Sequence, residues 1–75
     1  MKVLVVMRGE HGRGGSICGI FLEQDWDKAE ACALSQRACF GPWERDYWPE
    51  GKEFALVEWT SGCDWVVIEK HEITL

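Results

Sequence analysis

The sequence predicts an α+β domain in which one helix packs on one face of a four-stranded antiparallel sheet. Two pairs of strand-like segments, each with a short glycine-containing connection, flank one alanine-rich stretch in a chain of 75 residues. Two hairpins around one helix, in the order β-β-α-β-β, bury most apolar surface when the helix covers a single sheet. A chain of this length is expected to form one domain, over residues 1–75.

The first hairpin is predicted from two apolar segments and the glycines between them. Val3–Met7 is a nearly continuous apolar run, typical of a strand inside a sheet. Arg8–Ser16 contains four glycines, which tolerate positive φ and allow a sharp turn. Ile17–Glu23 is the second strand. Because side chains alternate between the faces of a strand, one face is expected to carry Ile17, Gly19 and Phe21. The other face is expected to carry Cys18, Ile20 and Leu22.

The helix is predicted from Trp26 to about Cys39, because this stretch is rich in alanine and free of glycine and proline. Asp25 is placed as the N-cap, and Asp27 adds negative charge to the first turn. Gly41-Pro42 is expected to end the helix. Helical spacing predicts one stripe facing the sheet: Trp26, Ala29, Ala33 and Phe40.

The second hairpin is predicted near the C-terminus. Glu53–Thr60 alternates, Ser61-Gly62 is a two-residue loop signal, and Cys63–Lys70 is again strand-like. The segment Trp43–Gly51 is interpreted as an irregular connection, so the sheet is expected to have four strands.

Composition limits the classes of partner. Eight Lys and Arg against 13 Asp and Glu give a net charge of −5. Binding to phosphates of nucleic acid, or to an anionic membrane, needs the opposite balance, so neither partner is expected. A hydrophobic content of 47% predicts a folded chain. The start at Met1-Lys2 shows no leader of signal-peptide type, so a cytoplasmic location is predicted.

The cysteines are expected to be reduced in that location and to serve as small apolar residues. They are Cys18, Cys32, Cys39 and Cys63. Their separations of 14, 7 and 24 residues contain no pair with zinc-ligand spacing. Neither His11 nor His71 is placed by the sequence beside a nucleophile, and a domain this small has little room for a catalytic pocket. No metal, cofactor or enzymatic activity is therefore predicted.

The glycine-rich segment is a candidate anion site. The residues that would form it are Arg8, His11, Arg13 and Gly14. Successive backbone N–H groups in such a segment can hold an anion. However, the segment leads into a strand, whereas the phosphate-binding fingerprints need a helix N-terminus after the glycines. A turn is therefore preferred here, and binding of a small ligand or nucleotide is kept as the alternative function.

The segment after the predicted helix is the preferred binding site. It is rich in Trp, Tyr and Arg, the residues that most often dominate protein interfaces. The predicted contact residues are Trp43, Glu44, Arg45, Asp46, Tyr47 and Trp48. In the competing interpretation, the tryptophans fold back to cover the sheet edge or the helix end, because small domains recruit aromatic residues to enlarge a thin core. The sequence leaves both interpretations open.

Four short motifs follow one another in the first half of the chain. They are the Val-rich Lys2–Arg8, the Glu- and Gly-containing Gly9–Gly15, the strand end Gly19-Ile20-Phe21 and the helix start Lys28-Ala29-Glu30. This series resembles a recurrent type of small bacterial and phage protein of unknown function, which implies no activity and no catalytic residue. In style, the small acidic chain is also similar to phage-encoded inhibitors of host defence, including anti-CRISPR proteins.

The predicted function is a non-enzymatic protein-binding module, encoded by a phage or mobile element and inhibiting a host complex. The acidic side chains favour a partner with a basic surface. A homodimer is also possible, because a sheet this small leaves edge strands to cover.

Overall fold

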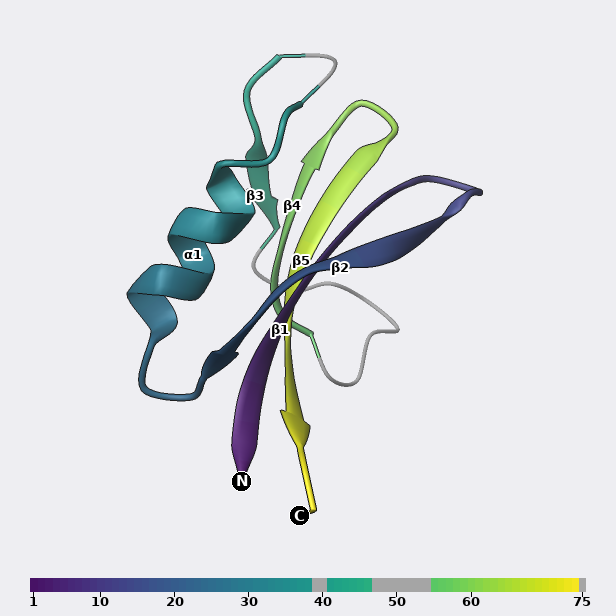
Figure 1. The fold of residues 1–75 in the computed structure, drawn as a ribbon. Coiled ribbons are helices and arrows are strands. Elements are labelled where there is room, and N and C mark those ends of the chain that lie inside the picture. The colour runs from purple at the N-terminus through teal and green to yellow at the C-terminus, as the bar shows by residue number, and fades with distance from the viewer. Residues whose placement is uncertain (39–40, 47–54, 75) are drawn as a thin grey trace.

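The computed structural model describes residues 1–38, 41–46 and 55–74, which form one helix and five strands. The elements are β1 (Lys2–Glu10), β2 (Gly14–Leu22), α1 (Trp26–Leu34), β3 (Glu44–Asp46), β4 (Ala55–Ser61) and β5 (Asp64–Glu72). All strand pairs are antiparallel, and α1 lies against one face of the sheet (Figure 1). The α+β class and the single helix are therefore confirmed for these residues.

The prediction of four strands is wrong, because the sheet has five strands in the order β2-β1-β5-β4-β3. The additional strand, β3, lies in the segment interpreted as an irregular connection. Its three residues pair with β4, with Arg45 opposite Trp59. A strand of three charged residues has no apolar alternation, so the sequence gives no sign of it. The segment is a strand because its backbone pairs with β4.

The first and last strands meet in the middle of the sheet. β1 pairs with β2 on one side and with β5 on the other. The chain ends are also joined, because the N–H of Ile73 donates to the carbonyl oxygen of Met1 at 2.7 Å. The chain then crosses from edge strand β2, over the sheet through α1, to the opposite edge at β3 (Figure 1). The two hairpins are thus fixed side by side.

The first hairpin is longer than predicted. Pairing continues to Glu10 and Gly14, so the turn contains only residues 11–13. Gly12 has a φ of 83° and Gly14 a φ of 72°, in the region that favours glycine. Gly9 and Gly15 lie opposite each other within the strands. Most of the predicted glycine loop is therefore strand.

In the second hairpin the loop lies one residue later than predicted. Ser61 pairs with Asp64, which leaves Gly62 and Cys63 as the two loop residues. Gly62 has a φ of 60°, the sign that a type II′ loop needs at its first position.

The helix ends at Leu34, earlier than predicted, and Gly41-Pro42 does not end it. The cause lies in two polar side chains just beyond its last turn. The hydroxyl of Ser35 and the amide of Gln36 both donate to the carbonyl oxygen of Cys32, at 2.7 and 3.0 Å. Side-chain bonds of this kind compete with continued helical bonding. The start is as predicted: Asp25 is the N-cap residue and Asp27 lies in the first turn, although no side-chain cap bond forms.

The core lies between α1 and the sheet. Ala29 and Ala33 are fully buried, so their small side chains bring the helix close to the strands. Phe40 of the predicted stripe lies outside the described residues. The buried core cluster consists of Leu4, Val6, Ala29, Ala33, Val57, Trp59, Val66 and Ile68. In the described part of the chain, no helix has the length and apolar character needed to cross a membrane.

Candidate protein-binding surface

The two edges of the sheet differ in length and charge. β3 has three residues, all charged, which is one way in which proteins keep an edge from pairing with another chain. β2 has nine residues, and none is charged or proline. Among the described strands, β2 has only β1 as a neighbour. Within the described ranges, the other side of β2 therefore offers backbone groups for pairing.

A β-bulge changes which side chains of β2 share a face. Val6 lies opposite Gly19, whereas Met7 lies opposite Ile17, so Cys18 is an extra residue. Ile17 and Ile20 therefore point to the same side of the sheet, away from α1. The predicted grouping of Ile17 with Gly19 and Phe21 is wrong. It assumed regular alternation, which the bulge interrupts.

The aliphatic side chains on that side are exposed. Ile17 is 59% exposed, Ile20 57% and Leu22 42%. We call these three residues the β2 strip. Their neighbours on β1 are much more protected, since Val3 and Val5 are buried. An exposed group of large aliphatic side chains beside an uncharged edge marks a surface for association.

The candidate anion residues fall into two places. Arg8, Arg13 and Gly14 line a hollow of about 410 Å³ along the first hairpin, together with Glu10. Both guanidinium groups already lie near carboxylates. Arg8 Nη2 is 3.9 Å from Oδ1 of buried Asp64, and Arg13 Nε is 3.7 Å from Oε2 of Glu10. The positive charge available to a phosphate is correspondingly reduced.

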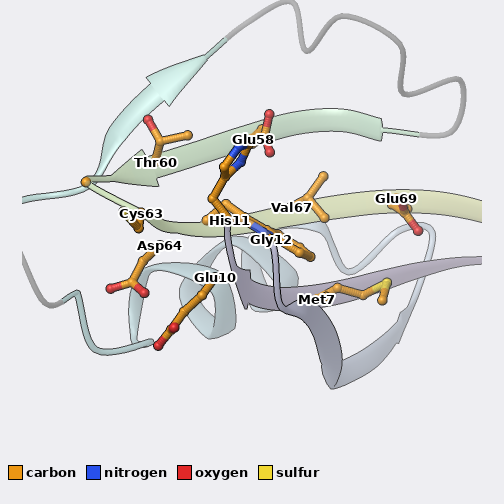
Figure 2. A pocket seen from close by; sticks show the side chains of 13 residues that line it. Met7, Glu10, His11, Gly12, Glu58, Thr60, Cys63, Asp64, Val67 and Glu69 are labelled. Carbon is orange, nitrogen blue, oxygen red and sulfur yellow. The ribbon is translucent and has the colours of Figure 1, made fainter.

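His11 lies at a second hollow, of about 570 Å³, which is lined by both hairpin turns and by residues of β1, β4 and β5 (Figure 2). Gly14 lines both hollows. The backbone N–H of His11 donates to the carbonyl oxygen of Cys63 at 2.7 Å, which joins the turns. Four carboxylate residues line this hollow: Glu10, Glu58, Asp64 and Glu69. Their charge disfavours an anionic ligand. Binding of a nucleotide through the glycine segment remains a prediction.

The aromatic segment is only partly described. Trp43 packs against the core, and its indole N–H donates to the carbonyl oxygen of Gln36 at 3.0 Å. This placement is the one expected if the tryptophan folds back on the helix end. Glu44 and Arg45 are exposed on β3, with the Arg45 guanidinium carbon 5.7 Å from the centre of the Trp59 ring. The backbone of Asp46 pairs with β4. Tyr47 and Trp48 lie outside the described residues.

The described cysteines, Cys18, Cys32 and Cys63, are free thiols. Cys18 and Cys32 pack at the edge of the core, as apolar residues would. Burial raises the pKa of the Cys32 thiol, and the nearby Cys18 adds to the effect. Cys39 is outside the described residues. Within the described ranges, no group of three or more His, Cys, Asp or Glu residues has a geometry suited to a metal ion.

The β2 strip was missed in the sequence. A signal was present: no charged residue occurs between Arg13 and Glu23, although 28% of the chain is charged. Such a gap is informative only when the segment is known to be an edge, and edge position depends on which strands meet in the sheet.

Searches of protein-family models, curated proteins and solved structures found no match to this chain.

Proposed function

We propose that the chain is a non-enzymatic protein-binding module whose contact surface is strand β2 with the β2 strip. One observation carries the proposal: the long edge of the sheet is uncharged and bears three exposed aliphatic residues. A strand of another chain can add to such an edge through backbone hydrogen bonds, while its side chains cover the strip. Burial of apolar area supplies the driving force, at about 25 cal/mol per Å².

The narrower predictions concern the origin and role of the module. Encoding by a phage or mobile element rests on the resemblance of the first half of the chain to small bacterial and phage proteins. Inhibition of a host complex rests on the similarity in style between this small acidic chain and phage-encoded inhibitors. The six predicted contact residues also remain predictions: Trp43, Glu44, Arg45, Asp46, Tyr47 and Trp48. Of these, Glu44 and Arg45 are exposed on β3, at the opposite edge of the described sheet. A cytoplasmic location also remains a prediction.

Two matched substitutions test the proposed surface. Leu22 in the strip and Leu34 at the end of α1 are similarly exposed, at 42% and 45%. Tagged wild-type, Leu22→Lys and Leu34→Lys chains are produced in cells of the source organism together with an untagged copy. Captured proteins, the copy included, are then identified by mass spectrometry.

We expect Leu22→Lys to lose captured proteins that the wild type and Leu34→Lys retain. Thermal unfolding of both variants verifies that the fold is intact. Retention of every captured protein by a folded Leu22→Lys chain would show that β2 is not the binding surface.

A further inference from the structure

We propose that β2 pairs antiparallel with β2 of a second copy, which joins the two described five-stranded sheets into one. The inference rests on the proposed function and names the partner at that same surface. Closed two-fold assemblies need one patch that is complementary to itself. Three features of the sheet indicate that β2 is this patch.

The first feature is the bulge. Residues 14–17 and 19–22 alternate out of step with each other, because Cys18 is inserted between them. In an antiparallel pair of copies, the first segment of one β2 lies beside the second segment of the other. Ile17 then lies opposite Ile20 of the second copy, and Gly15 opposite its Leu22. All four positions lie on the face of the sheet that is turned away from α1, so the two strips merge into one apolar surface.

The same register explains why a second copy suits this edge better than a regular strand. A regular strand that pairs with β2 must shift its register by one residue at Cys18, as β1 does between Val6 and Met7. A second copy carries the same extra residue at the same place. The two bulges then face each other across the two-fold axis, and pairing continues in one register on both sides.

The second feature is charge. Two chains with a net charge of −5 repel each other over most of their surfaces, but β2 contributes no charge to that repulsion. At its ends the charges are opposite in sign. Arg13, whose side chain is 82% exposed, precedes β2, and Glu23 follows it. Antiparallel pairing places Arg13 of one copy near Glu23 of the other. This attraction would add to the ion pairs that the two residues make within their own chain, with Glu10 and Lys70.

The third feature is the contrast with the other edge. Self-pairing of β3 about its central residue would place Arg45 opposite Arg45 of the second copy. Like charges directly opposite each other destabilise a strand pair. Of the two edges in the described sheet, only β2 is therefore suited to a second copy.

The experiment measures mass against concentration for the purified chain. Sedimentation equilibrium from about 1 µM to about 1 mM covers the affinities expected of a small interface. We expect the mass to rise from the monomer value of 8.6 kDa to twice that value. Leu22→Lys should weaken the dimer roughly tenfold or more, since it removes a buried Leu from both copies. Leu34→Lys should leave the dimer unchanged.

A complementary pair of variants tests the register. Ile17→Lys and Ile20→Glu each place an unmatched charge in the dimer and should each sediment as monomers. Mixed in equal amounts, they should form a heterodimer, because the new lysine of one chain lies opposite the new glutamate of the other. A mixture that stays monomeric would overturn this register. Circular dichroism of each variant verifies folding.

The outcomes separate the two proposals. A wild-type chain that is monomeric at every concentration, or a dimer insensitive to Leu22→Lys, overturns the inference of a second copy. If Leu22→Lys nevertheless loses other captured proteins, β2 binds a different chain and the proposed function stands.

Discussion

The indole of Trp65 occupies the space that a side chain on Gly15 would need. A Cβ atom on Gly15 would lie 2.5 Å from Cη2 of Trp65 and 2.7 Å from the carbonyl oxygen of Arg8. Gly9 meets the same ring, with Cζ2 at 2.5 Å. These two glycines are opposite each other in the first hairpin. Their role is therefore to let an aromatic ring of β5 lie against the strands.

This contact predicts that Gly15→Ala destabilises the fold through Trp65. We expect a cost of about 1–3 kcal/mol, the usual range for overpacking. Trp65→Phe removes the ring atoms that lie over Gly15. Gly15→Ala should therefore cost roughly 1 kcal/mol less in a Trp65→Phe chain than in the wild type. Urea unfolding of the four chains in the cycle measures the difference. Strictly additive costs would show that the two residues do not interact.

The glycines also show how far the sequence alone leads. Alternation and helical composition are local properties, and they predicted both hairpins, the helix start and the α+β class. The role of Gly15 depends on Trp65, which is far away in the chain and meets it only across β1. The bulge at Cys18 and the edge position of β2 likewise depend on which strands become neighbours. The candidate surface was therefore missed, although its residues had been placed in a strand.

The ion pair of Arg8 with Asp64 is expected to stabilise the fold, in contrast to that of Arg13 with Glu10. Asp64 is 3% exposed, so removal of a nearby cation leaves a buried carboxylate less well compensated. Arg8→Met keeps the aliphatic stem and should cost about 1 kcal/mol or more. Arg13→Met, at an exposed pair, should change stability by less than about 0.5 kcal/mol. Equal effects in urea unfolding would contradict this assignment.

Substitution of Trp43 distinguishes a packing role from a binding role. Its ring packs against the core and its indole N–H bonds to Gln36, so Trp43→Ala should lower the free energy of unfolding by about 2 kcal/mol. Trp43→Phe keeps most of the packing and should lose about 1 kcal/mol for the hydrogen bond. Thermal unfolding measures both. An unchanged stability combined with a lost partner would instead make Trp43 an interface anchor.

Glu23, the residue that follows β2, should have a pKa below the ordinary glutamate value. Oε2 of Glu23 lies 2.6 Å from Nζ of Lys70, and this hydrogen bond is the main reason that the pKa of Glu23 is lowered. A lowered pKa in the folded state means that the pair stabilises the fold above the ordinary glutamate pKa. The contribution is lost as the pH falls through the folded-state value.

Lys70→Gln should therefore raise the pKa of Glu23 towards its ordinary value, as followed by NMR titration of the side-chain carboxyl. The exposed Lys28 provides the control, since Lys28→Gln changes the net charge equally without touching this pair. High salt should also raise the pKa in the wild type, because both side chains are accessible to solvent. If the Glu23 pKa moves equally in the two variants, the shift comes from net charge and not from the bond to Lys70.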